Sequence, residues 1–375
     1  LLSGGSRIFT TDGYYNTQTE KARLGKRPQL FNKGRKLTGD SISYDKKTGF
    51  SQAFRNIVFT DSTDANNKNI LMGDYGWYKE KVGEALATKR ALAKNFSRNA
   101  DTLYVHADTL RLFSYDLRTD SAYRVLHGYF HVRAYRTDVQ AVCDSLVFHS
   151  KLRKLSLYRD PIAWSDDRQI LGEEINAYTN DSTLDSVYVE RQALIVQQLP
   201  DTVHFNQVSG NMLQAYFAKG QLYQARVNGN AMVINFPIEK DSSLLYQNYC
   251  EAAKMRIDIV DRKMRRYWAG PSPIAKTYPI NMAPAEHTKF SNFAWFSRIR
   301  PQGPHDLFEC RAKSDEHQIK ILPRRAAPMQ TRDKNKATGA TQWEKKIEVP
   351  LETPTSPTTQ TSVNDSLPSN SSNTH

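Results

Sequence analysis

Apolar and polar residues alternate along much of this chain, most clearly over residues 208–236. One predicted strand runs to Phe217 and a returning strand to Val227, with Lys219-Gly220 as the turn between them. Asn228-Gly229-Asn230 is predicted to be a second turn, because Gly and Asn accept positive φ easily. The stretch therefore predicts two antiparallel strands and the start of a third. The residues that share one side are Asn211, Leu213, Ala215 and Phe217, then Tyr223, Ala225 and Val227.

A short signature recurs: a small residue, an acidic or amide residue, then apolar side chains two and four positions later. Copies are 29 to 42 residues apart, which predicts a stack of units that cover each other's apolar faces. The small residue lets the backbone bend, and the Asp or Asn is predicted to accept backbone N–H groups in an Asx-type turn before a strand. The copies are Gly39-Asp40, Gly73-Asp74, Ala107-Asp108, Cys143-Asp144, Gly172-Glu173, Gly210-Asn211 and a degenerate Ala252-Ala253.

A second apolar segment lies about midway between successive corners, so one repeat is predicted to be a hairpin plus a linking strand. The fold class is therefore all-β, with a β-sandwich of similar hairpins as the alternative. A helix competes at 83–94, which is rich in helix formers, and at 246–266, where period-two alternation favours a strand. The second segments are Asn56-Ile57-Val58-Phe59 and residues 128–132, 160–164, 193–196 and 229–233.

The regular pattern ends near Gly270. Prolines interrupt the following stretch, and residues 271–322 are predicted to be an irregular segment whose aromatic side chains pack on the last repeat. Residues 323–375 are rich in Pro, Thr, Ser and Asn and too poor in apolar residues to offset the entropy of ordering, so a disordered tail is expected. The aromatic residues are Phe290, Phe293, Trp295 and Phe296.

Composition narrows the class of protein. Hydrophobic content of 39% and a mean hydropathy of −0.64 are low for a compact enzyme, whereas 19 Tyr and 16 Phe suit strands. A net charge of +13 favours anionic partners such as nucleic acid, a membrane surface or a phosphorylated lipid.

Cys143, Cys250 and Cys310 are too scattered for a disulfide framework or a zinc site. The start at Leu1 without Met indicates a processed or truncated product, so a missing signal peptide does not argue against export.

Catalytic and cofactor motifs are not found: the sequence has no P-loop, GxGxxG, GxSxG or HExxH. We therefore expect no enzyme activity, no cofactor and no metal. His127 and His131 would share a strand face about 13 Å apart, and two ordinary polar strand residues are favoured over a metal site. The repeated carboxylates, Asp40 to Glu173, are interpreted as structural corners, because a catalytic pair occurs once and not in every unit.

Basic residues cluster in predicted turns. Solvated turns are the ordinary interpretation, and phosphate contact by charge-assisted hydrogen bonds is the functional one. Nucleic-acid binding is disfavoured, because the aromatic residues follow the inward parity of the repeat and do not interleave with the basic ones. The candidate phosphate contacts are Lys151, Arg153, Lys154, Arg262 and Arg265.

The corners, the segments Asn56-Ile57-Val58-Phe59 and Asp160-Pro161-Ile162-Ala163-Trp164, and Gly229-Asn230-Ala231 resemble the OstA/LptA family of lipopolysaccharide-transport proteins. The resemblance covers residues 11–270, and Phe293-x-Trp295 to Arg300-Pro301 resembles the closing portion of longer OstA-like members. It implies an open, twisted β-jelly roll, a solenoid-like stack of antiparallel strands folded into a V with an apolar groove. The chain departs from the compact bridge proteins of this family in its length, basic insertions and tail.

The resemblance also implies a function, that of a non-enzymatic periplasmic carrier or bridge that takes part in outer-membrane biogenesis and in organic-solvent tolerance. Its cargo would be lipopolysaccharide or lipooligosaccharide. Its partners would be related jelly rolls at the inner and outer membranes, stacked edge to edge, with a homo-oligomer and an outer-membrane association left open. The predicted groove residues are Ile42, Tyr44, Leu110, Leu112, Leu146, Phe148, Ile175, Leu213, Ala215 and Phe217.

An acyl chain of about 14 carbons gains on the order of 10 kcal/mol by burial, far more than a surface ion pair contributes. The alternative function is a structural or glycan-binding β-solenoid of the cell envelope without lipid cargo. A nucleic-acid binder is a third interpretation, and it predicts salt-sensitive retention on DNA.

Overall fold

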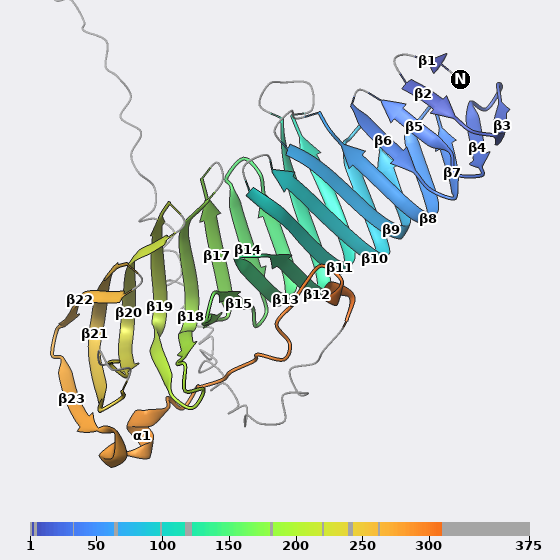
Figure 1. Cartoon of the computed structure of the whole chain (residues 1–375). Helices are drawn as coiled ribbons and strands as arrows, with labels where there is room; N and C mark the ends of the chain where they lie inside the picture. The colour runs from blue at the N-terminus through green and yellow to red at the C-terminus, as the bar shows by residue number, and fades with distance from the viewer. Residues whose placement is uncertain are drawn as a thin grey trace, which may run out of the picture. The chain divides into compact units, whose positions relative to one another are not determined.

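A computed structural model describes residues 2–309, apart from gaps at 4–5, 33, 64–66, 98–99, 117–121, 181–182, 220, 239–242 and 262. The described strands form one antiparallel sheet, in which most long strands pair with the next strand along the chain and several short strands pair with one farther along (Figure 1). This confirms the predicted all-β stack. No helix in the described part is long and apolar enough to cross a membrane. The predicted tail, 323–375, lies outside the described residues.

The central strands are long, and each pairs in antiparallel register with the next one. The stretch at 83–94 is strand, not helix, because its alternate alanines, Ala85 and Ala87, are buried between neighbouring strands. The long strands are β8 (Phe50–Asp61), β9 (Asn67–Lys79), β10 (Glu84–Ser97), β11 (Ala100–Tyr115), β12 (Tyr123–Arg136), β13 (Val139–His149), β18 (Leu184–Gln198), β19 (Phe205–Ala218), β20 (Gln221–Asn235) and β21 (Tyr246–Val260).

Towards the chain ends and between β13 and β18 the strands are short, because a bend interrupts them. Two short strands in succession then form the equivalent of one long bent strand: β14 pairs with β17 while β15 pairs with β16. The short strands are β1 (Leu2–Ser3), β2 (Ser6–Phe9), β3 (Asp12–Asn16), β4 (Lys21–Gly25), β5 (Gln29–Asn32), β6 (Arg35–Thr38), β7 (Ser41–Asp45), β14 (Lys154–Tyr158), β15 (Ile162–Ser165), β16 (Arg168–Leu171), β17 (Glu174–Thr179), β22 (Lys263–Gly270) and β23 (Ile274–Pro279).

The bends follow one rule along the stack. On alternate strands two consecutive residues are left-handed, such as Lys89-Arg90 in β10 and Gly229-Asn230 in β20, with φ from +49° to +75°. On the strands between them the small residue of the signature faces this pair, and the register shifts there. Residues 228–230 are therefore a bend within β20 and not the predicted turn. One repeat is two bent strands, and not a hairpin plus a linking strand.

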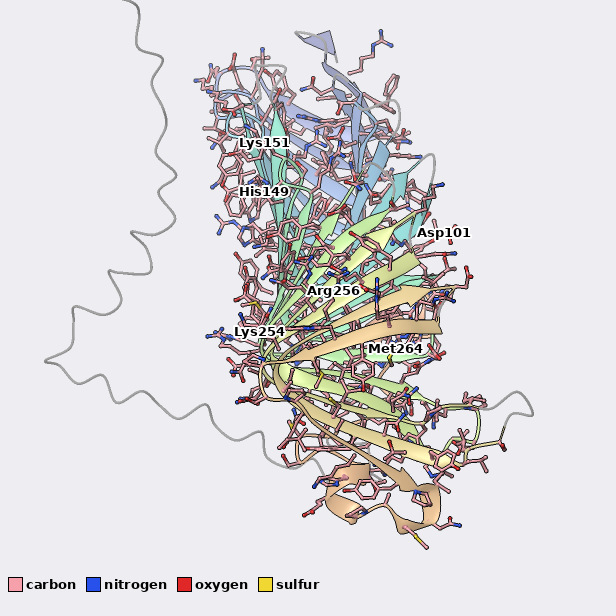
Figure 2. The ribbon with its side chains drawn as sticks, turned by 90° about the vertical axis from the view of Figure 1, so that its left-hand side faces the viewer. Asp101, His149, Lys151, Lys254, Arg256 and Met264 are labelled. Atoms are coloured by element: carbon pink, nitrogen blue, oxygen red, sulfur yellow. The ribbon has the colours of Figure 1, made fainter. Side chains whose placement is uncertain are left out.

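The bends divide the sheet into two limbs. Limb A carries the hairpins at 46–49, 80–83 and 150–153, and limb B carries those at 137–138, 166–167 and 199–204. Figure 2 shows Lys254 close to the bend, with Arg256 and Met264 farther along limb A. Each limb has an inner face towards the other limb and an outer face away from it, because successive side chains of a strand point to opposite sides.

The main core lies between the inner faces of the two limbs. Limb A contributes large side chains such as Leu110 and Leu213, and limb B contributes small ones such as Ala193 and Ala231, each of them 0% exposed. Small residues opposite large ones let the limbs approach closely beside the bend. A separate, smaller cluster occupies the N-terminal end, formed by Ala22, Leu24, Ile42, Ala53 and Ile57.

A C-terminal strap, residues 285–309, covers the outer face of limb B (Figure 1). It follows the short helix η1 (Ile280–Met282) and contains α1 (Ala285–Thr288) and η2 (Asp306–Phe308). Its aromatic side chains reach well beyond the last repeat: Phe293 packs on Phe205 of β19, and Phe308 lies 4.8 Å from the ring of His106 on β11. The prediction that this segment packs on the last repeat was therefore too narrow.

Candidate functional site

The predicted groove residues all lie on the inner face of limb A, on β7, β11, β13, β17 and β19. Ile42 and Tyr44 belong to the N-terminal cluster, and the others apart from Leu112 lie in or beside the main core. Leu112 is two residues from Leu110 on β11, so it points to the same face. Six are fully buried: Ile42, Leu110, Leu146, Ile175, Leu213 and Ala215, whereas Tyr44, Leu112, Phe148 and Phe217 are half-buried.

Burial on the inner faces falls with distance from the bend. Leu146 and Leu213, next to the bend, are at most 1% exposed, whereas Phe148 and Phe217, nearer the hairpins, are half-buried. We call the first group the floor and the second the rim. Because the floor is closed by protein, the exposed apolar surface of the inner faces lies along the rim.

The inner face of limb B is the second wall, and the predicted residue set does not include it. Ile195, Val208 and Val233 are its half-buried members, and they pack against the same core as Phe148 and Phe217. The sequence marked part of this wall, because the second apolar segments at 193–196 and 229–233 contain Ile195 and Val233. The bend decides which face of those segments points inwards, and the spacing of residues in the sequence did not show where the bend lies.

The repeated carboxylates lie at the bends, where their partners are side chains of a neighbouring strand in place of the backbone N–H groups expected in an Asx-type turn. Asp40 accepts from Nδ2 of Asn56 at 3.1 Å, and Asp108 lies 2.8 Å from Nδ1 of His131. Asp144 accepts from Nη1 of Arg159 at 3.3 Å. In each case the donor belongs to the left-handed pair of the neighbouring bent strand, so the carboxylate ties two strands together at the bend.

The two predicted strand histidines do not share one face, because the β12 bend lies between them at Phe130-His131. His127 packs against the ring of Phe113 at 5.2 Å, and burial lowers its pKa, while His131 pairs with Asp108 at the corner. Among the residues described, no group of three or more His, Cys, Asp or Glu is placed to hold a metal ion.

The predicted phosphate contacts are not gathered in one place. Lys151, Arg153 and Lys154 occupy the β13–β14 hairpin, and the ammonium groups of the two lysines lie over the rings of Tyr123 and Tyr178 at 5.3 and 5.7 Å. Arg265 is exposed on β22, about 29 Å away along limb A, since six strand spacings separate β14 from β22. Arg262 lies outside the described residues.

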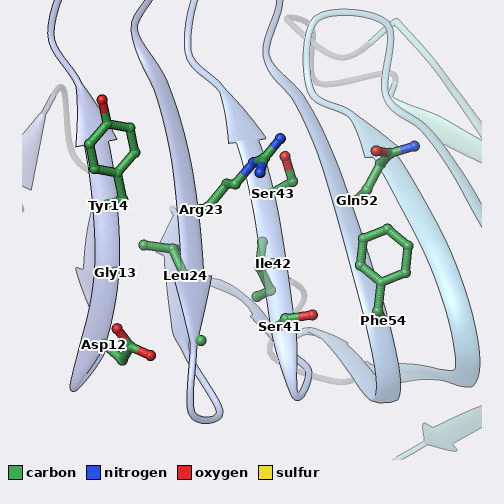
Figure 3. A pocket seen from close by; sticks show the side chains of 11 residues that line it. Asp12, Gly13, Tyr14, Arg23, Leu24, Ser41, Ile42, Ser43, Gln52 and Phe54 are labelled. Atoms are coloured by element: carbon green, nitrogen blue, oxygen red, sulfur yellow. The ribbon is translucent and has the colours of Figure 1, made fainter.

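Two open hollows mark the outer face of limb A, one near each end of the stack. The N-terminal hollow, about 600 Å³, lies over β3, β4, β7 and β8 (Figure 3). Small side chains, Ser41 and Ser43, form its base, and the exposed rings of Tyr14 and Phe54 lie on either side. Arg23 is its only cationic lining residue.

The C-terminal hollow, about 550 Å³, lies over β20, β21 and β22 and is strongly cationic. Its only carboxylate lining residue is Asp258, which accepts from Nε of Arg256 at 2.9 Å and lies 3.4 Å from Nε of Arg266. Hydrogen bonds from Arg256 and Gln224 hold the pKa of Asp258 at about 2, so it stays ionised. The cationic lining residues are Arg226, Lys254, Arg256 and Arg266.

No protein-family model and no curated protein matches this sequence. Among solved structures the chain is similar to LptH from Pseudomonas aeruginosa, described as the LptA homologous periplasmic component of the conserved lipopolysaccharide transport device. The two are 16% identical, the match covers 37% of this chain and 93% of that one, and the TM-score is 0.29.

Proposed function

We propose that this chain is a non-enzymatic, periplasmic carrier or bridge for lipopolysaccharide or lipooligosaccharide, and that it holds acyl chains between its two limbs. The observation that carries the proposal is the apolar lining of both inner faces, which continues from strand to strand between β9 and β21. A row of apolar side chains along a stack suits a long, flexible hydrocarbon better than it suits a compact substrate.

The rim supplies the surface that an acyl chain would cover. Phe148 and Phe217 on limb A face the same core as Ile195 and Val208 on limb B, and all four keep part of their surface exposed. Burying an acyl chain contributes about 0.8 kcal/mol per CH₂. Because the gain is spread evenly along the row, a chain could slide from one repeat to the next with little change in free energy.

The ends of the sheet suit contact with further copies or with related sheets. Among the described strands, β22 and β23 pair only with β21, and β3 pairs only with β4. Unpaired edge strands expose N–H and C=O groups that another strand can complete. Stacking at these edges would extend both inner faces across the joint, so a lipid path could continue into the partner.

Bound-lipid mass spectrometry tests the proposal directly. The full chain is purified from a Gram-negative periplasm without detergent and extracted with organic solvent, and we expect acyl chains with a lipid A saccharide in the extract. An extract free of acyl chains would favour the alternative, a structural or glycan-binding β-solenoid of the envelope without lipid cargo.

Photo-crosslinking then locates the lipid. A photoreactive residue at Phe217 should give lipid adducts, and one at the neighbouring Tyr216 should not, because Tyr216 is also half-buried but lies on the outer face beside Tyr188. Phe148 and Val147 form a second matched pair across the same sheet. Adducts on the outer-face member of each pair would exclude the space between the limbs as the lipid site.

A further inference from the structure

We propose that the C-terminal hollow on the outer face of limb A binds a phosphorylated saccharide, with its cations on the phosphate and Trp268 against the sugar ring. The site lies on the opposite face of limb A from the lipid space, and it is not formed by the basic turns that the sequence suggests. It stands on the geometry of β20, β21 and β22, independently of the proposed lipid cargo.

Strand pairing brings the basic side chains together. Arg226 of β20 lies opposite Arg256 of β21, which in turn lies opposite Trp268 of β22. Lys254 is two residues from Arg256 on the same strand, so it points to the same face. The arrangement places an exposed cationic group on each of three adjacent strands, around one concave surface.

The charges in the hollow are not balanced by the protein. Four cationic lining residues surround one carboxylate, which leaves a net charge of +3. Asp258 binds Arg256 through both oxygens, at 2.9 and 3.1 Å, while its contact with Arg266 is long at 3.4 Å. The side chain of Lys254 makes no hydrogen bond or ion pair with any described residue. Lys254 and Arg266 therefore have donors available for an added anion.

A phosphate group fits these donors better than a carboxylate does. It carries close to two negative charges near neutral pH and three acceptor oxygens, so it can accept from several cations at once. The net charge of the hollow would then fall from +3 to about +1. A planar, bidentate arginine such as Arg266 and a mobile ammonium such as Lys254 are both common phosphate donors.

Trp268 gives the site its preference for a sugar. Its side chain is 58% exposed beside the arginines, an unusual position for so large an apolar ring. An amphipathic ligand can lay its apolar face on the indole while its polar edge stays with the cations. Inorganic phosphate would leave this ring uncovered, whereas a phosphorylated sugar would cover it.

The N-terminal hollow provides an internal comparison. It lies on the same outer face and has a similar volume and exposed aromatic rings, but Arg23 is its only cationic lining residue and Asp12 also lines it (Figure 3). With one positive and one negative side chain it has no excess charge for a phosphate. Tight binding of a phosphorylated ligand is therefore expected at the C-terminal hollow and not here.

Titration calorimetry at low ionic strength tests the proposal with three probes: glucosamine 6-phosphate, glucosamine and inorganic phosphate. We expect the phosphorylated sugar to bind more tightly than either of the others, and Lys254→Gln with Arg266→Gln to weaken it about tenfold or more. Trp268→Ala should reduce the affinity for the phosphorylated sugar towards that of inorganic phosphate. Added salt should weaken binding as well.

Matched variants decide the location. Lys151→Gln with Arg153→Gln removes two charges from a basic turn, and Arg23→Gln removes the cation of the N-terminal hollow, and neither should change the affinity. The proposal is overturned if no probe binds or if these controls lose as much affinity as the Lys254 and Arg266 variant. It is also overturned if inorganic phosphate binds as tightly as glucosamine 6-phosphate. Bound acyl chains are read out separately, so this site and the lipid cargo can fail independently.

Discussion

At the bends of Gly172 and Gly210 a glycine is required, because a neighbouring side chain occupies the place where a Cβ would be. A Cβ added to Gly210 would lie 2.3 Å from Cγ1 of Val227, and one added to Gly172 would lie 2.3 Å from Cγ1 of Val189. Both valines are 0% exposed and β-branched, so they have little freedom to move away.

Replacing Gly210 with alanine tests this packing. We expect Gly210→Ala to lower the free energy of unfolding by about 1–3 kcal/mol, because overpacking forces Val227 out of its place. Gly303→Ala is the control, since a Cβ at Gly303 meets nothing within 4 Å. Equal midpoints for the two variants in denaturant unfolding would contradict the role given to Gly210.

The sequence predicted where the corners lie but not which residues bind the corner carboxylates. Small–acidic pairs at regular spacing were enough to locate the bends, because both residue types recur on the same strands. The partners of the carboxylates, such as Asn56 and Arg159, belong to a neighbouring strand, and spacing alone does not show which residues lie opposite. Left-handed pairs such as Lys89-Arg90 contain no glycine, so the residue types gave no sign of positive φ.

At the scale of elements, the strap is fixed by glutamines on the outer face of limb B. Gln169 donates to the carbonyl of Ala294 at 2.8 Å and accepts from the N–H of Phe296 at 2.7 Å. Gln207 makes the same kind of pair with the carbonyl of Thr288 and the N–H of Phe290, at 2.9 and 3.0 Å. An extended segment without strand pairing thereby satisfies its buried backbone groups.

Gln169→Ala should weaken the strap. The substitution leaves the buried N–H groups of Phe296 and Trp164 without their acceptor, which costs about 1–3 kcal/mol for each group. We expect a lower unfolding midpoint and faster proteolysis of residues 285–309. Gln221→Ala, at an exposed position at the start of β20, should change neither. Unchanged proteolysis in Gln169→Ala would show that aromatic packing alone holds the strap.

The sequence contains recurring glutamines at the strand positions that bind the strap, but their binding partner could not be inferred from it. Gln140, Gln169 and Gln207 each lie four residues before the acidic or amide residue of a corner, at three successive repeats. A glutamine recurring at an otherwise apolar strand position indicates a recurring buried partner. That partner lies 81 to 160 residues away in the chain, as in the bond from Arg300 to Gln140, so no local pattern could identify it.

The end of the strap is expected to loosen in mild acid. Burial lowers the pKa of His106, an effect that Arg133 and Arg90 increase and that Asp108 and the carbonyl of Ala91 oppose. Below pH 6.5 the unfolded chain takes up a proton that the folded chain resists, so stability is lost as the pH falls. Because Phe308 packs on this ring, amides near residue 308 should exchange faster at pH 5.5 than at pH 7.5, relative to intrinsic rates. His106→Gln should remove the difference, and its persistence would assign it to another group.

At the scale of the whole described region, burial is unevenly distributed along the stack. The N-terminal cluster has five buried apolar side chains, two of them alanine, whereas the main core runs from β9 to β21 and the strap adds a further layer on limb B. At the boundary β9 presents Gly73 and Gly76, which bring no side chain to the interior. In a stacked array each unit is stabilised chiefly by its neighbours. A boundary with few buried side chains therefore limits the cooperativity of unfolding across it.

Hydrogen exchange should therefore show two levels of protection. We expect the amides of β3, β4 and β7 to open with a free energy about 3 kcal/mol lower than those of β18–β20, which corresponds to exchange about 100-fold faster. Ile57→Ala should speed exchange in the N-terminal strands only, and Leu213→Ala only in the central ones, because Ile57 and Leu213 belong to separate clusters. If either substitution speeds exchange equally at both ends, the described strands unfold as one cooperative unit and the glycines of β9 do not separate them. If the effects stay local, the N-terminal strands can open while the space between the central limbs remains closed. Opening at that edge would then allow contact with a second sheet at little cost in stability.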